Sequence, residues 1–260
     1  MKHIFIKQFT LICLLSVNYY LYGQTKIIAH RGFWNTDGSA QNSITALKKA
    51  AEAGVYGSEF DVIITADGIP VVNHDDAING IRIEDADYKS LKNIKLKNGE
   101  TLPTLEKYLK AGKKLKKTKL ILEIKPHKQQ INEERAAQTT VNLVKKLKLT
   151  EQVEYISFSL FICKELHRLS PGSQVAYLNG NLSPSELKEI GLTGLDYNQS
   201  VLQKHPEWVQ EAHTLGLSVN VWTVNDINLI RKFTDDGVDF ITTDKPLEAL
   251  SIASPALLKP

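Results

Sequence analysis

The sequence predicts a single α/β domain, a (β/α)8 barrel, and three observations support this fold class. The chain has 260 residues, close to the ~250 residues typical of such barrels. Strand-like apolar runs alternate with amphipathic helical segments from residue 26 to the end, a pattern typical of a parallel sheet. No linker interrupts the eight runs, which favours closure into a barrel. The expected strands span residues 26–30, 57–64, 119–125, 153–158, 174–179, 194–198, 218–224 and 239–243.

An open, doubly wound sheet is the alternative arrangement for the same alternation of elements. It is disfavoured because no glycine-rich phosphate-binding fingerprint follows the first strand. The composition suits either arrangement, with 42% hydrophobic and 23% charged residues, which are ordinary values for a globular protein. The sequence therefore predicts a sizeable folded core.

Residues 1–23 differ from the rest and are interpreted as a secretory signal peptide, which leaves residues 24–260 as the barrel domain. Lys2, His3 and Lys7 form a basic start, and a mostly apolar run over residues 9–22 ends at Gly23. An uncleaved membrane anchor is the alternative, but the run is shorter than the ~20 residues needed to span a bilayer. Cys13 has no small residues before it, which argues against a lipoprotein anchor. We expect a secreted or periplasmic protein with no stable membrane insertion after cleavage.

The mature chain gives no sign of a nucleic-acid partner. Removal of residues 1–23 takes away two lysines and no acid, leaving 30 basic and 29 acidic residues and a net charge of +1. A nucleic-acid-binding domain is usually strongly basic. Cys163 is then the one remaining cysteine, so no intrachain disulfide can form, and its apolar helical surroundings predict a core position. The sequence does not give the oligomeric state.

Helix start and stop signals lie between the expected strands. Asn42 and Ser183 are candidate N-caps, and residues 183–186 (Ser-Pro-Ser-Glu) combine a capping box with proline in the first turn. Glycines occur where helices should end, at Gly54, Gly191 and Gly216.

A β-hairpin and a short insertion are expected after the second strand. Asp67-Gly68 separates two apolar runs, a typical hairpin signal, so the chain should return to the barrel rim at His74. Residues 75–100 form the insertion, followed by a helix over about 103–115. The many lysines of this helix are expected on a solvated outer surface, with attraction of anionic head groups as the alternative.

Three carboxylates on expected barrel strands predict a metal site. Glu59 and Asp61 are two residues apart, so they share one face of their strand. Glu123 lies on the next barrel strand, on the same face as Ile121 and Lys125. Paired carboxylates are costly to bury alone, and a hard divalent cation such as Ca²⁺ or Mg²⁺ takes carboxylate oxygens. A structural ion pair is the alternative for any single pair, and zinc is disfavoured because the set contains no thiolate.

His30 and His74 are candidate catalytic residues. His30 ends the first strand and His74 ends the hairpin, so both are expected at the carboxyl face of the barrel, where barrel enzymes carry their chemistry. An imidazole takes or gives a proton near neutral pH. Since three carboxylates already suffice for one metal ion, the histidines are expected to act as acid and base rather than as ligands.

Two cations and an aromatic residue complete the candidate site. Arg31 and Lys125 could contact a phosphate group, or they could neutralise the carboxylates instead. Trp222 could form an apolar wall for the substrate or belong to the barrel core. Phe33 and Trp34 could pack against a substrate group or only cover the barrel. Together these groups are suited to hydrolysis of a phosphate ester at a divalent metal ion.

Several segments resemble the glycerophosphodiester phosphodiesterase family, in the family's order. They are IIAHRG, QNSITAL, SEFDVIITADGIPVVNHDD, LEIKP, NVWTVND and GVDFITTDKP, which together reach over about residues 26–246. The resemblance implies a TIM barrel that hydrolyses deacylated phospholipids to glycerol 3-phosphate and an alcohol, using Ca²⁺ or Mg²⁺. By position it implies that Glu59, Asp61 and Glu123 bind the metal, that His30 and His74 form the acid/base pair, and that Arg31 and Lys125 contact the phosphate.

One position departs from the family pattern. Gln41 stands where the family usually has glutamate, so a neutral amide replaces a charge near the metal or the substrate hydroxyls. Substrate preference is therefore less defined than reaction type. The alternatives are a phosphodiesterase for lysophospholipids or other lipid-like diesters, and a barrel that binds phosphodiesters without turnover.

Overall fold

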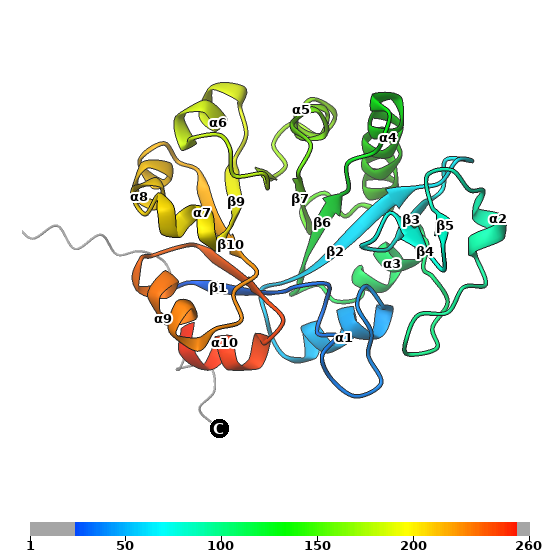
Figure 1. The fold of residues 1–260 in the computed structure, drawn as a ribbon, viewed down its shortest axis with the longest axis horizontal. Coiled ribbons are helices and arrows are strands. Elements are labelled where there is room, and N and C mark those ends of the chain that lie inside the picture. The colour runs from blue at the N-terminus through cyan, green and yellow to red at the C-terminus, as the bar shows by residue number, and fades with distance from the viewer. Residues whose placement is uncertain (1–23, 254–260) are drawn as a thin grey trace, which may run out of the picture.

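A computed structural model describes residues 24–253, and its centre is a closed ring of eight parallel strands (Figure 1). The ring closes because β1 pairs with β11 on one side and with β2 on the other. This closure excludes the open sheet, and all eight strands predicted from the sequence are present. The ring comprises β1 (Lys26–Ala29), β2 (Gly57–Ile64), β6 (Lys119–Ile124), β7 (Val153–Ser157), β8 (Val175–Tyr177), β9 (Gly194–Asn198), β10 (Ser218–Trp222) and β11 (Phe240–Thr243).

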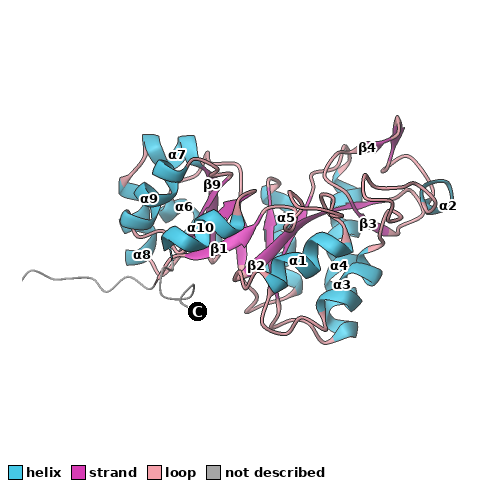
Figure 2. Cartoon of the chain, turned by 90° about the horizontal axis from the view of Figure 1, so that it is seen from below, coloured by secondary structure: helices cyan, strands magenta, loops and turns pink. Residues whose placement is uncertain are grey.

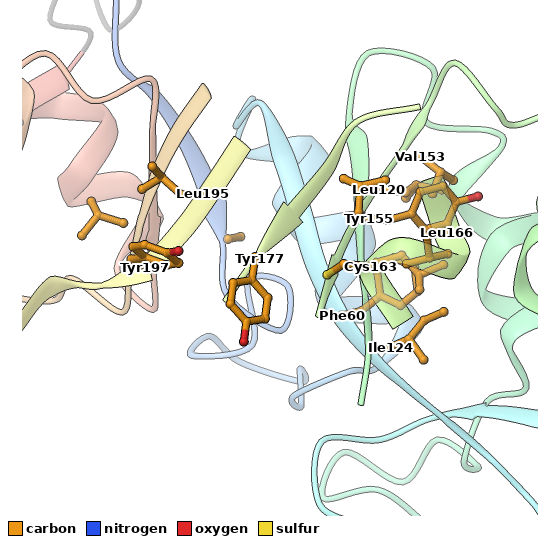
Figure 3. Packing of buried hydrophobic residues seen from close by; sticks show 14 of the residues in the cluster. Phe60, Leu120, Ile124, Val153, Tyr155, Cys163, Leu166, Tyr177, Leu195 and Tyr197 are labelled. Carbon is orange, nitrogen blue, oxygen red and sulfur yellow. The ribbon is translucent and has the colours of Figure 1, made fainter. Parts of the chain in front are cut away.

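Helices surround the ring, and the main core lies between the strands and these helices (Figures 1 and 3). Phe60 faces outward from β2 into this core, with its ring 4.3 Å from that of Tyr108. Cys163 is fully buried in the same layer, which confirms its expected core position. The helices are α1 (Ile44–Glu52), α2 (Tyr88–Leu91), α3 (Leu105–Gly112), α4 (Gln130–Leu147), α5 (Leu160–Leu169), α6 (Pro184–Ile190), α7 (Gln199–Lys204), α8 (Glu207–Thr214), α9 (Ile227–Asp235) and α10 (Pro246–Ala253).

The inward faces of the strands form a second apolar cluster inside the barrel. Ile28, Ile121, Ile156 and Leu178 are its buried members. Because successive side chains of a strand alternate between its faces, the position of Ile121 inside the barrel also places Glu123 inside.

The predicted hairpin and insertion follow β2. The short strand β3 (Pro70–Val72) runs antiparallel to β2, and Gly68 adopts the positive φ of +82° that the turn requires. The insertion contains the small hairpin of β4 (Ala77–Ile78) and β5 (Ile81–Arg82) together with α2, and Figure 2 shows them grouped on one side of the barrel. Its own small core includes Val71, Ile83 and Leu91.

Two of the sequence-based boundaries need correction. The helix expected over 103–115 is shorter, spanning Leu105–Gly112, and its lysines are exposed as expected for an outer surface. The N-cap of α1 is Ser43, whose hydroxyl accepts from the backbone N–H of Ala46, and not Asn42. The predicted capping box at Ser183 and the αL glycine cap at Gly191 are both confirmed.

The predicted signal peptide, residues 1–23, lies outside the described residues. Across residues 24–253, the helices are all too short or too polar to cross a membrane.

Candidate active site

The three predicted carboxylate ligands converge at the carboxyl end of two adjacent strands. Asp61 of β2 pairs in register with Glu123 of β6, and Glu59 lies two residues earlier on the same face. One oxygen from each residue lies within 4.8 Å of the others. This span matches the roughly 4.6–5.2 Å between opposite oxygen ligands of Ca²⁺, which binds each at 2.3–2.6 Å.

Burial gives these carboxylates unequal pKa values. Burial raises the pKa of Glu59 well above its usual range, and the charges of Asp61 and Glu123 raise it further. Burial and then Asp61 raise the pKa of Glu123 to about 8. Burial also raises the pKa of Asp61, but the charges of Lys125 and His74 outweigh it, so that this pKa is lowered. A divalent cation would relieve this repulsion, so the donor set fits a metal ion.

Asn42 holds Asp61 in place. Its side-chain Nδ2 donates to Asp61 Oδ2 at 2.8 Å, and its Oδ1 accepts from the Asp61 backbone N–H at 3.1 Å. Asn42 adopts a φ of +60°, a conformation that asparagine tolerates better than most residues. A residue expected to cap a helix therefore orients a candidate metal ligand instead.

Lys125 contacts the carboxylates directly. Its Nζ lies 2.9 Å from Glu123 Oε1 and 3.3 Å from Asp61 Oδ1. Of the two interpretations drawn from the sequence, neutralisation of the carboxylates is the one observed in this structure, and phosphate contact stays a prediction.

Arg31 lies in a tight loop after β1. It has a φ of +54°, and its backbone N–H donates to Glu59 Oε2 at 2.6 Å. Gly32 follows with a φ of +77°, and a Cβ there would lie 2.7 Å from the Cβ of Ala46. The Arg31 guanidinium donates to Gln41 Oε1 at 3.0 Å. Because an amide holds the guanidinium without neutralising it, Gln41 leaves the full charge of Arg31 available to an anion.

His30 is oriented by a partly buried hydrogen-bond network around Asp244. Its Nδ1 lies 2.9 Å from Asp244 Oδ1, which also accepts from the indole of Trp34 at 3.0 Å. Asn225 donates to the other carboxylate oxygen at 2.7 Å. Burial raises the pKa of Asp244, but these hydrogen bonds outweigh it and lower the pKa to about 2. An ionised Asp244 holds the proton on His30 Nδ1, which leaves Nε2 as the free acceptor.

His74 returns to the rim on the hairpin, as predicted. Its Nδ1 lies 2.7 Å from Asp75 Oδ1. Burial lowers the pKa of His74, although Asp61 and Asp75 raise it. The lowered pKa favours the neutral ring, which is the form that accepts a proton.

The aromatic residues divide between the site and its support. Trp222 lines the cavity and packs edge-on against Phe158, with ring centroids 5.5 Å apart. Trp34 supports Asp244, and Phe33 packs against the main core.

One cavity of about 170 Å³ gathers nearly all the predicted side chains. Asp61 is not among its lining residues, but its carboxylate contacts Lys125, which is. Its lining includes His30, Arg31, Glu59, His74, Glu123, Lys125 and Trp222.

The sequence-based interpretation missed the supporting residues Asp244 and Asn225. Both lie within the segments that carried the resemblance, directly after the last two strands. That placement at the carboxyl ends of barrel strands was the available signal.

The fold and site define a barrel phosphodiesterase, and comparisons with known proteins identify the family. The model of the glycerophosphoryl diester phosphodiesterase family matches residues 30–248, so the chain belongs to this family. It is accordingly an enzyme, and the alternative of a barrel that only binds phosphodiesters is not supported.

Three relatives illustrate the similarity. The crystal structure of a glycerophosphodiester phosphodiesterase from Parabacteroides distasonis is 53% identical, covers 90% of this chain and 98% of that one, and has a TM-score of 0.89. A phosphodiesterase from Oleispira antarctica, solved with its product sn-glycerol-3-phosphate, is 26% identical over 88% of this chain and 96% of that one, with a TM-score of 0.75. A glycerophosphodiester phosphodiesterase from Caldanaerobacter subterraneus is 25% identical over 86% of this chain and 95% of its own length.

Proposed function

We propose that this enzyme hydrolyses glycerophosphodiesters to glycerol 3-phosphate and an alcohol, with one Ca²⁺ or Mg²⁺ ion and a histidine acid/base pair. The observation that carries the proposal is the convergence of three buried carboxylates, two histidines and two cations on one cavity. The Oleispira relative, which was solved with glycerol 3-phosphate, supports the substrate class.

The side chains divide the chemistry between them. When bound by Glu59, Asp61 and Glu123, a divalent cation would offset the charge of the phosphodiester and its transition state. With the carboxylates neutralised in this way, Lys125 would be free to join Arg31 in contacting the phosphate oxygens. One histidine assists attack on phosphorus, and the other protonates the departing alcohol. The attacking group is either water, which gives glycerol 3-phosphate directly, or the neighbouring glycerol hydroxyl, which gives a cyclic phosphate that water then opens to glycerol 3-phosphate.

The direct test is product formation from glycerophosphocholine and glycerophosphoethanolamine. We expect release of glycerol 3-phosphate, its loss in EDTA, and its recovery on addition of Ca²⁺ or Mg²⁺. No product with Ca²⁺, Mg²⁺ or Mn²⁺ across several head groups would refute the proposal.

Substitution of each histidine tests the acid/base pair. His30→Ala and His74→Ala should each lower kcat by ~10²-fold or more, the scale of lost acid–base catalysis. His205→Ala is the matched control, because this ring stacks on Trp208 at the edge of an outer helix. A near-normal rate in either active-site variant would remove that residue from the mechanism.

The alternative substrate class is lysophospholipids, and a groove at the rim bears on the choice. It measures about 600 Å³ and lies between the loop after β1 and the insertion. Its lining mixes apolar side chains such as Trp34 and Ile78 with polar ones such as Gln41, Asn73 and Lys95. This mixture favours a polar head group over an acyl chain. Faster turnover of lysophosphatidylcholine than of glycerophosphocholine would reverse this preference.

We also propose that the enzyme is exported, on the basis of the basic and apolar character of residues 1–23. Expression of the full chain followed by N-terminal sequencing of the exported product tests this. A product that stays in the cytoplasm with residues 1–23 intact would contradict it.

A further inference from the structure

Asp196 is a buried carboxylate that the proposed mechanism does not use. It lies in the middle of β9 with 2% of its surface exposed, and it lines the catalytic cavity together with His30, Glu59 and Glu123. Its Oδ1 is fully buried and has no hydrogen-bond partner among the described residues. A buried carboxylate oxygen without a partner is costly, so it requires an explanation.

Its surroundings do not neutralise it. None of the ion pairs in residues 24–253 involves Asp196. The neighbouring Asn220 and Thr242 hydrogen-bond to each other at 3.0 Å, and the Trp222 indole donates to the backbone carbonyl of Asp196 and not to its carboxylate. Burial raises the pKa of Asp196 to about 7, although a side-chain hydrogen bond with Asn220 opposes the rise, so the carboxylate is paired with a neutral amide and with no cation.

The barrel places Asp196 across the cavity from the metal site. In the ring, β9 lies four strands from β2 in either direction, so it stands opposite the strand that carries Glu59 and Asp61. A phosphodiester whose phosphate lies at the carboxylate cluster must direct one organic arm toward this far wall. Around Asp196 the lining is mainly apolar, with Phe158, Leu178 and Trp222, and it also contains the polar Thr223 and Thr242.

A mainly apolar wall with one carboxylate and few other hydrogen-bonding groups suits a short hydroxylated carbon chain. The C–H groups of such a chain pack against the aromatic rings, while a hydroxyl reaches the carboxylate. In a glycerophosphodiester, the terminal hydroxyl of the glycerol arm is the group farthest from phosphorus along that arm.

We propose that Asp196 accepts a hydrogen bond from the terminal hydroxyl of the glycerol arm and thereby selects glycerol over arms that lack this hydroxyl. The inference rests on the proposed function, since it takes the phosphate to lie at the carboxylate cluster. It makes Asp196 a specificity-determining residue.

The test compares two substrates that differ only in this hydroxyl, glycerophosphocholine and 2-hydroxypropyl phosphocholine. Asp196→Ala should lower kcat/KM for glycerophosphocholine by about 10- to 100-fold, the scale of a lost hydrogen bond to a charged group. For 2-hydroxypropyl phosphocholine the same substitution should change kcat/KM by less than about threefold, because this substrate lacks the hydroxyl that would bond to Asp196. Asp196→Asn, which keeps the shape, should give an intermediate loss and guards against a folding defect in the alanine variant.

Ser218→Ala is the matched control. Asp196 also lines a second cavity of about 280 Å³ toward the other end of the barrel. Ser218 lines this second cavity but not the catalytic one. We expect the Ser218 variant to retain wild-type kcat/KM on both substrates. An equal loss on both substrates in the Asp196 variants, no loss on either, or the same loss in Ser218→Ala would overturn the inference.

A binding measurement separates this inference from the proposed function. Calorimetry of glycerol 3-phosphate and 2-hydroxypropyl phosphate with the same variants requires no turnover. Preference of the wild type for glycerol 3-phosphate, lost in Asp196→Ala, would support the role of Asp196 even if hydrolysis failed. Equal affinities in both proteins would contradict it even if hydrolysis succeeded.

Discussion

Binding of a divalent cation to the metal-free enzyme should release protons, and the structure sets the number. Burial beside Asp61 raises the pKa of Glu123 to about 8, so at pH 7 this carboxyl is mainly protonated. Glu59 also has a raised pKa, whereas that of Asp61 is lowered. Since a carboxyl must lose its proton to bind a metal, we expect release of between about one and two protons per ion at pH 7.

Isothermal titration calorimetry measures this number directly. Ca²⁺ is titrated into EDTA-treated, dialysed protein at pH 7 in Pipes and in Tris, whose ionisation enthalpies differ, and the difference in observed heat gives the protons released. The affinity should rise by about tenfold per pH unit for each proton released between pH 6 and 8. Glu123→Gln should reduce the release by about one proton, since this carboxyl is mainly protonated at pH 7 in the metal-free protein. Equal heats in the two buffers would refute the reasoning.

Three further predictions concern stability and catalysis. The Tm of the metal-free protein should fall as the pH rises from about 5 to 8, because carboxyls whose pKa is raised in the folded state bind their protons more tightly there than in the unfolded state. Ca²⁺ should reverse this trend. A Tm that stays constant over this pH range would contradict the prediction. Asp244→Asn should lower kcat by ~10²-fold or more without unfolding the protein, since it removes the charge that orients His30, and a steady-state assay with circular dichroism checks this. Gly32→Ala should destabilise the fold by about 2 kcal/mol or more in urea unfolding, because it adds a close contact at a positive φ; an unchanged unfolding midpoint would show that the loop adjusts.

Most of the fold could be predicted from the pattern of strands in the sequence. A buried parallel strand is apolar along its length, so each of the eight ring strands was visible as an apolar run. The same regularity made Glu59 and Asp61 conspicuous, because two acids on one face of such a strand conflict with burial. Strand alternation then sufficed to orient Glu123 as well.

Asn42 shows where local patterns are insufficient. Asparagine before a helical run is a typical N-cap, and Ser43 next to it is another. The choice between them depends on Asp61, whose carboxylate and backbone N–H both bond to the Asn42 side chain. Such a contact between a loop residue and a strand residue 19 positions later leaves no trace in the spacing of neighbouring residues.

Asp244 and Asp196 were missed for related reasons. Asp244 follows a strand in a segment rich in turn-forming residues, where an aspartate is ordinary. Asp196 is a single acid in a strand, without the i, i+2 partner that drew attention to Glu59 and Asp61. Only the closed ring shows that one supports His30 and that the other faces the catalytic cavity.

The bond between His30 and Asp244 joins residues 214 positions apart, and this has a consequence for biosynthesis. The carboxylate cluster and both histidines are complete once residue 123 has been made, yet His30 gains its orienting partner only when β11 and the residue after it have been added. A nascent chain arrested before β11 would therefore carry every group expected to bind the cation or transfer a proton, with His30 lacking its orienting aspartate. Full activity therefore requires that the chain has been synthesised through residue 244 and that the first and last strands have paired.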